Sequence, residues 1–165
     1  MQSIDKEPVT IESIIEAVKS YQPKANIRLI QRAYELANSA HKGQKRVSGE
    51  EYIIHPLHVA QILTELHIDD VTISAALLHD VVEDSDLTLD DLRRKGVDDE
   101  VLAALELLTH DKTTDYFEYV HRIAHSGNYT AIHTKINDLK HNLDRGRKSN
   151  KKAKELNDIE KSERL

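Results

Sequence analysis

The chain has 165 residues, of which 39% are hydrophobic and 32% charged, so it is long enough for one globular domain with its own core. A formal net charge of −6 argues against general attraction to nucleic acid or to an anionic membrane, and the absence of cysteine excludes disulfides and thiolate metal sites. No apolar run approaches the roughly 18 residues of a membrane span and no signal-peptide pattern is present, so we expect a cytoplasmic protein.

Apolar residues recur at helical spacing from the start of the chain. The pattern predicts a helix over 10–21, with Thr10 as its N-cap, and a second over 26–43, which Gly43 is expected to end. The stretch 46–55 has loop and strand-like character.

Pro56 suits the first turn of a helix that extends to about residue 67, with Val59, Ile62, Leu63 and Leu66 facing inward. Further helices are predicted over 71–83, 88–96, 98–109, near 115–125 and over 128–144. The sequence therefore predicts an all-α fold, a compact multi-helix bundle. We expect one domain over 1–146, and 147–165 to form a charged C-terminal helix or tail.

The segment "SAALLHDVVED" (74–84) places four polar groups in an otherwise apolar helix. These are His79, Asp80, Glu83 and Asp84, and their three- and four-residue spacings predict side chains on adjacent turns of one helix. Burying such charges without partners costs several kcal/mol each. A bound cation would compensate for them.

His79 and Asp80 offer one nitrogen and one oxygen ligand, the mixture expected for Mn²⁺, Fe²⁺ or Zn²⁺. One helix cannot surround a metal, so further ligands must come from elsewhere. His55, just before a proline at a helix start, and Asp138 are the candidates, and Asn142 follows Asp138 on the same helical face.

These four ligands would leave room for water, with Glu83 as the general base and Asp84 supporting it or holding the attacking water. The alternative is a structural one, in which His79 and Asp80 form a buried hydrogen-bonded pair and the acidic residues mark an exposed helix end. A second His-Asp pair, "THD" at 109–111, lacks a following acidic pair, and we interpret it as a decoy.

Three separated stretches carry a family resemblance: "AHKGQKRVSGEEYIIHPLHVAQIL", "AALLHDVVEDSDLTLDDL" and "KINDLKHN". In this order they resemble the hydrolase domain of RelA/SpoT-type enzymes and the small alarmone hydrolases, within the HD superfamily. The fold implied is an HD-domain bundle. The reaction implied is removal of the 3′-pyrophosphate of ppGpp or pppGpp, with Mn²⁺ as the usual metal and another divalent metal as the alternative.

The resemblance also assigns residue roles. The metal ligands it implies are His55, His79, Asp80 and Asp138. Glu83 and Asp84 match the acidic pair that activates and positions water. Lys45, Arg46 and Asn142 match residues that contact the nucleotide, and a basic patch beside the site suits a polyphosphate ligand of a net-acidic protein. A solubilising loop is the other interpretation of that patch.

Two other functions remain open at this level. One is an HD-type phosphohydrolase acting on another nucleotide, and the other is a non-catalytic nucleotide-binding module. In all of them the partner is a small-molecule nucleotide, not nucleic acid or a membrane. Surface or satisfied core positions are expected for His58, His67, His121, His125, His133 and His141, and a structural role near a helix end for His41. Helix packing is expected for the aromatic side chains of "DYFEYV", which are Tyr116, Phe117 and Tyr119.

Overall fold

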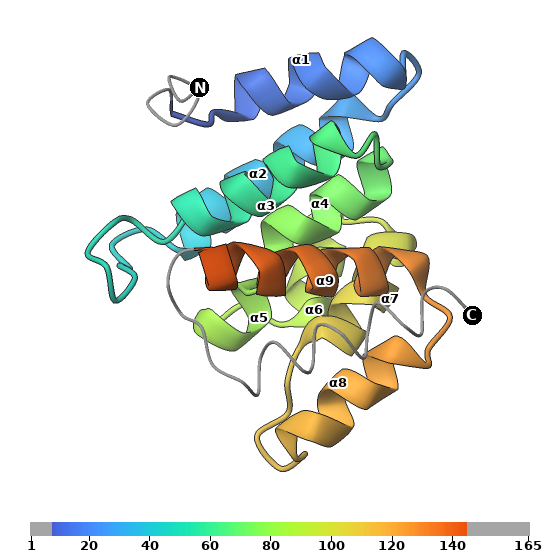
Figure 1. The fold of residues 1–165 in the computed structure, drawn as a ribbon. Helices are drawn as coiled ribbons and strands as arrows, with labels where there is room; N and C mark the ends of the chain where they lie inside the picture. Colours follow the sequence, from blue (N-terminus) through green and yellow to red (C-terminus); the bar gives the residue numbers. More distant parts are fainter. Residues whose placement is uncertain (1–7, 145–165) are drawn as a thin grey trace.

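The computed structural model describes residues 8–144, and its regular secondary structure is helical (Figure 1). Within that range no strand forms, and the expected strand-like stretch is a loop with one isolated antiparallel bridge between Lys45 and Glu51. The prediction of an all-α bundle is confirmed. The helices are α1 (Ile11–Tyr21), α2 (Ile27–Ala40), α3 (Ile54–Glu65), α4 (Asp70–Leu78), α5 (Val81–Asp84), α6 (Leu89–Arg94), α7 (Asp99–Leu108), α8 (Tyr116–Ala124) and α9 (Tyr129–Asp144).

The N-terminal helix starts as predicted. The Thr10 side chain accepts a hydrogen bond from the Ser13 backbone N–H at 3.1 Å, and Ser13 returns the contact to the Thr10 N–H, which forms a capping box. Ile11, Ile14 and Val18 form the buried stripe, and they hold α1 against α2 and α3.

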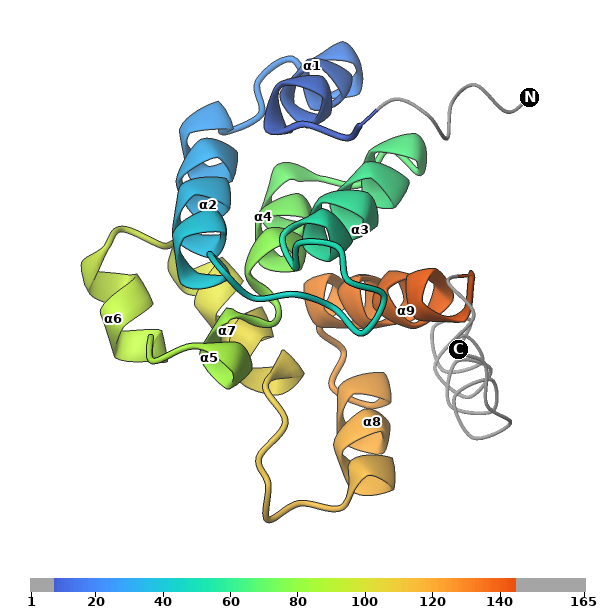
Figure 2. The ribbon, with the colours of Figure 1, turned by 90° about the vertical axis from the view of Figure 1, so that its left-hand side faces the viewer.

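Helix α4 is the centre of the bundle, and it packs against α2, α3, α7 and α9 (Figures 1 and 2). Its side chains from Thr72 to Leu78 are all buried. A helix that is apolar on every side belongs in a core, and this one places its C-terminal end in the middle of the protein.

The predicted single helix over 71–83 is wrong in one respect. Helix α4 ends at Leu78, and α5 begins at Val81, with His79 and Asp80 at the break. The His79 ring nitrogen Nδ1 contacts the Ala76 carbonyl at 2.6 Å, and the His79 backbone N–H donates to the same carbonyl at 3.5 Å, which closes the end of the helix. His79 and Asp80 therefore lie at a helix terminus, and Glu83 and Asp84 belong to a separate short helix.

A second correction concerns α3. Pro56 is buried in its first turn as expected, but Leu66 is 53% exposed instead of facing inward. The helix ends at Glu65, and His67 then takes a left-handed conformation with φ of 57°, so Leu66 lies beyond the last helical residue and outside the buried face.

Helix α9 crosses the bundle beside α3, α4 and α7. Its middle therefore lies near the start of α3 and the end of α4, which is where the predicted ligands come from. Residues 1–7 and 145–165 lie outside the described part, so the division into 1–146 and a charged 147–165 segment stays a prediction. No helix within 8–144 has both the length and the apolar character needed to cross a membrane.

Candidate metal centre and its pocket

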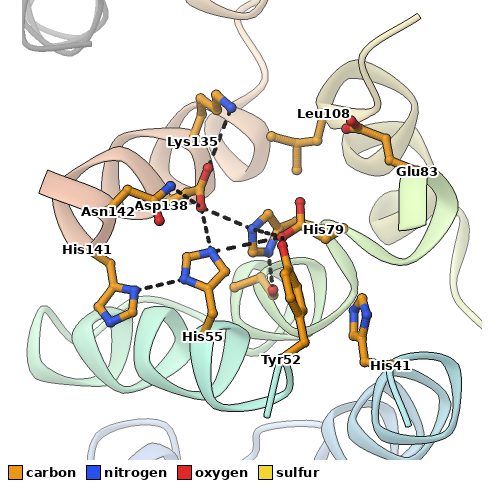
Figure 3. Close-up of polar contacts among 12 residues, drawn as sticks. His41, Tyr52, His55, His79, Glu83, Leu108, Lys135, Asp138, His141 and Asn142 are labelled. Atoms are coloured by element: carbon orange, nitrogen blue, oxygen red, sulfur yellow. Dashed lines mark hydrogen bonds and ion pairs between the residues drawn. The ribbon is translucent and has the colours of Figure 1, made fainter. Parts of the chain in front are cut away.

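The four predicted ligands come together from α3, from α9 and from the break between α4 and α5, and Figure 3 labels His55, His79 and Asp138 among them. Asp138 Oδ1 lies 2.7 Å from His55 Nε2 and 3.2 Å from His79 Nε2. Asp80 Oδ2 lies 3.1 Å from His79 Nε2 and 3.9 Å from His55 Nε2. Residues up to 83 positions apart in the chain therefore direct their polar atoms to one point.

The orientation of His79 leaves one nitrogen for a ligand. A carbonyl oxygen only accepts hydrogen bonds, so Nδ1 must donate to the Ala76 carbonyl. Nε2 points between the carboxylates of Asp80 and Asp138, and it offers its lone pair to a metal when the ring is neutral. Backbone anchoring of one nitrogen and a free second nitrogen is the usual state of a metal-ligating histidine.

The residues present fit a divalent cation. One ligand atom each from His55, His79 and Asp80 lie within 4.8 Å of one another, and Asp138 adds a second carboxylate to both imidazoles. Nitrogen and oxygen donors in this mixture suit first-row divalent metals. We conclude that the donor set is able to hold such an ion.

The electrostatics agree with that fit. Burial disfavours the imidazolium form of His79, but Asp80 and Asp138 outweigh it and raise the pKa of this ring well above its usual value. Burial likewise works against both ionised carboxylates, yet His79 holds the pKa of each below its usual range. For His55 burial dominates and lowers the pKa. The carboxylates thus favour positive charge at the point where the Nε2 atoms converge.

Glu83 lies beside this cluster without belonging to it. Its Oε2 accepts a hydrogen bond of 3.0 Å from the His110 backbone N–H, which fixes the carboxylate at one side of the site. Burial, aided by the charge of Asp80, raises the pKa of Glu83. Asp84 is the next residue on α5, and burial raises the pKa of its carboxyl as well. The "THD" stretch, interpreted as a decoy, thus contacts the site through the His110 backbone N–H, which donates to Glu83.

A pocket of about 140 Å³ opens between the cluster and the α7–α8 connection. Its lining residues are His79, Asp80, Glu83, Leu108, His110, Tyr116, Tyr119 and Lys135. The pocket therefore joins two candidate ligands, the candidate base and one lysine in a single space.

The predicted nucleotide-binding residues divide into two kinds. Lys45 is exposed on the loop before α3. Arg46 is only 6% exposed, and its Nη2 donates to Asn142 Oδ1 at 2.8 Å. Asn142 Nδ2 in turn lies 3.5 Å from Asp138 Oδ1. Arg46 and Asn142 thus tie the loop to α9 close to the candidate metal centre.

Sequence reasoning missed three residues that touch this cluster. The Tyr52 hydroxyl donates to Asp80 Oδ2 at 2.5 Å, His141 Nδ1 lies 2.8 Å from His55 Nδ1, and Lys135 Nζ lies 3.5 Å from Asp138 Oδ2. Their spacing from the predicted ligands could have indicated these contacts. Tyr52 precedes His55 by three residues, and Lys135 and His141 stand three residues before and after Asp138 on a predicted helix.

The remaining aromatic groups have mixed outcomes. Tyr119 is buried, stacks on His110 and donates its hydroxyl hydrogen to the Leu108 carbonyl. Phe117 is 53% exposed on α8, and its ring stacks on that of His121 one turn along the same helix. His41 is buried near the end of α2, where its Nδ1 lies 3.0 Å from Gln44 Oε1, and its ring lies against Tyr52.

Replacing Tyr52 with phenylalanine is expected to weaken divalent-metal binding by about 10- to 100-fold, since outer-shell partners of this kind orient ligating carboxylates. Titration of Mn²⁺ followed by calorimetry measures the change. Tyr21→Phe is the matched control, because it also deletes one hydroxyl hydrogen bond, to the Ile68 carbonyl, away from the site. Equal affinities in wild type and Tyr52→Phe would contradict the expectation.

Comparison with known proteins decides the family. The profile of the HD domain family matches residues 33–128, which is more than half of the chain. The chain belongs to the HD domain family. The matched range contains His55, His79, Asp80 and the acidic pair of α5, and Asp138 lies beyond it.

Relatives of this HD domain are similar to it over about half of its length. It is 48% identical over 87 residues to the GTP pyrophosphokinase of Streptomyces coelicolor, and 47% identical over 81 residues to the guanosine-3′,5′-bis(diphosphate) 3′-pyrophosphohydrolase of Vibrio cholerae. The matches cover 51% and 49% of this chain but only 10% and 12% of those much longer proteins.

A solved structure shares the fold. It is described as a metazoan ortholog of SpoT that hydrolyzes ppGpp, and it superposes with a TM-score of 0.67 at 24% sequence identity. The match covers 81% of this HD domain and 84% of the other chain. The two chains therefore share the same helical architecture over the matched part, which is about four fifths of each.

Proposed function

We propose that this HD domain is a metal-dependent hydrolase that removes the 3′-pyrophosphate of ppGpp and pppGpp, giving GDP or GTP and pyrophosphate. The observation that carries the proposal is the convergence of two imidazole Nε2 atoms and two carboxylates beside Glu83. The similarity of about half of this chain to a 3′-pyrophosphohydrolase supports the choice of substrate.

His55, His79, Asp80 and Asp138 are the residues proposed to hold the metal. A bound divalent ion lowers the pKa of water and offsets negative charge on phosphoryl oxygens. We propose Mn²⁺, because two imidazoles with two carboxylates form the mixed nitrogen and oxygen set that suits it, and other divalent metals are the alternatives to be compared.

Glu83 is proposed as the general base. A water oxygen bonds to the phosphorus attached to ribose O3′, and its proton passes to the Glu83 carboxylate. The P–O3′ bond breaks, and O3′ leaves with the bonding pair and takes up a proton. Asp84, next on α5, is proposed to position the water. Burial raises the pKa of Glu83, which makes its carboxylate a stronger base than a free one.

The nucleoside end is proposed to bind at Lys45, Arg46 and Asn142. Arg46 and Asn142 already contact each other at 2.8 Å, so a nucleotide would meet a preformed pair instead of two mobile side chains. Lys45 adds an exposed positive charge on the same loop. A nucleotide substrate is also consistent with the cytoplasmic location that we propose.

Chelation of divalent metal is expected to abolish ppGpp hydrolysis, and Mn²⁺ is expected to restore it more fully than Mg²⁺ or Zn²⁺. The assay follows GDP and pyrophosphate release from purified protein. A panel of other nucleotides and nucleoside phosphates tests the substrate. Faster turnover of another nucleotide would replace ppGpp, and nucleotide binding without turnover under any metal would refute hydrolysis.

A further inference from the structure

Helix α9 presents three polar residues along one buried stripe. Lys135, Asp138 and Asn142 follow one another at intervals of three and four residues, and all three are buried. Figure 3 shows Lys135 and Asn142 flanking Asp138. The stripe therefore places a cation on one side of a candidate metal ligand and an amide on the other.

Lys135 is an unusual side chain for this environment. It is only 9% exposed, and lysine is almost never buried without a partner. Among residues 8–144 its recorded ion pair is the 3.5 Å contact with Asp138, which is long for a charge-assisted hydrogen bond. The ammonium also lies 5.1 Å from the Tyr119 ring centroid and 5.6 Å from that of Tyr116. Ring faces do not occupy donors as carboxylates do, so the ammonium retains capacity for an anion.

The space beside Lys135 is the pocket shared with His79, Asp80 and Glu83. Apart from histidine and tyrosine, the other ionisable side chains around that pocket are those of Asp80 and Glu83, and both are acidic. Among residues 8–144, Lys135 is the one lysine or arginine that lines the pocket, so it is the permanently charged side chain that an entering anion meets. That combination suits a phosphoryl group bound between the lysine and a metal.

We propose that Lys135 binds the pyrophosphate group of the substrate, so that the substrate lies along α9 with its pyrophosphate in the Lys135 pocket and its nucleoside toward Asn142. The inference rests on the proposed function. It also agrees with the position of Glu83, which lines the same pocket and would reach water on the phosphate side of the cleaved bond. The Lys135 charge would stabilise the departing pyrophosphate as the P–O3′ bond breaks.

The test measures binding of inorganic pyrophosphate to Mn²⁺-loaded protein by titration calorimetry. Lys135→Met is expected to weaken this binding by about 10- to 100-fold, the loss expected for one charge-assisted contact. Binding of GDP is expected to stay within about twofold, because GDP lacks the 3′-pyrophosphate. Lys140→Met, on the same helix and outside the pocket lining, is the matched control and should bind pyrophosphate like wild type.

Metal content separates this role from a purely structural one. If Lys135→Met loses Mn²⁺ together with pyrophosphate binding, the lysine acts as a counter-ion of Asp138 and the proposal is wrong. Unchanged pyrophosphate affinity also overturns it. Lys135→Arg keeps the charge and provides the second variant if Lys135→Met does not fold, with partial retention of pyrophosphate binding expected and full loss contradicting the proposal. If wild type binds pyrophosphate through Lys135 yet does not hydrolyse ppGpp, only the proposed function fails.

Discussion

Replacing Asp138 with asparagine is expected to lower divalent-metal affinity by more than about 100-fold and hydrolysis by about 1,000-fold or more, because the change removes one charged ligand from a buried set. Asp138 is central to the arrangement, since its Oδ1 lies within 3.2 Å of both imidazole Nε2 atoms. Asparagine has the same shape and offers a neutral oxygen, so the difference isolates the charge.

The melting temperature reports metal binding independently of activity. An ion that binds only the folded state stabilises it by about 2.7 kcal/mol at a concentration of 100 Kd, so wild type should show a rise in melting temperature with Mn²⁺. Asp138→Asn should gain no more than about 0.4 kcal/mol at the same concentration, because a loss of affinity of about 100-fold brings that concentration down to one Kd. Asp86→Asn removes one carboxylate from an exposed position after α5 and serves as the control. A full Mn²⁺-dependent shift in Asp138→Asn would exclude Asp138 as a ligand.

Most of the fold could be predicted from local patterns. The capping residue Thr10 and the apolar spacing that follows it define α1, because both signals act within a few residues of each other. The same holds for α6, which begins after the Thr88 capping box and ends before Gly96, whose φ is 95°. Sequence patterns are sufficient to predict a helix end when the residues that cap it lie next to it in the chain.

The end of α4 and the start of α5 could not be predicted in this way. The apolar pattern continues from Leu78 into Val81 and Val82, so periodicity alone favours one long helix. The break at His79 depends on the ring contact with the Ala76 carbonyl and on Asp138, which is supplied by a helix 59 residues further along the chain. Tertiary contacts that serve the site thus override the local pattern.

The candidate site was predictable to a similar degree. The histidine and carboxylate positions follow from motif and spacing, and the structure brings all four together. Their supporting contacts did not follow, because tyrosine, lysine and a second histidine on a helix are more often packing or surface residues. Arg46 shows the same limit: its charge suggested a solvent-facing patch, and the structure turns it inward to Asn142.

Replacing Glu83 with glutamine is expected to lower the hydrolysis rate by about 100- to 10,000-fold, the usual contribution of a general base. Glutamine keeps an oxygen that can accept the hydrogen bond from the His110 N–H, so α5 and the pocket should retain their shape. Metal binding should be unchanged, because the proposed ligands are His55, His79, Asp80 and Asp138, and Glu83 is not among them.

The contrast with Asp138→Asn makes this assignment specific. Asp138→Asn should lose metal and activity together, whereas Glu83→Gln should lose activity and keep the Mn²⁺-dependent rise in melting temperature. Glu100→Gln, at an exposed position in the first turn of α7, controls for the loss of one negative charge. Full turnover in Glu83→Gln would remove it from the role of base. Loss of the metal-dependent shift would instead make Glu83 part of the ligand set. A ligand is needed for the metal to bind, whereas a general base is needed only for turnover.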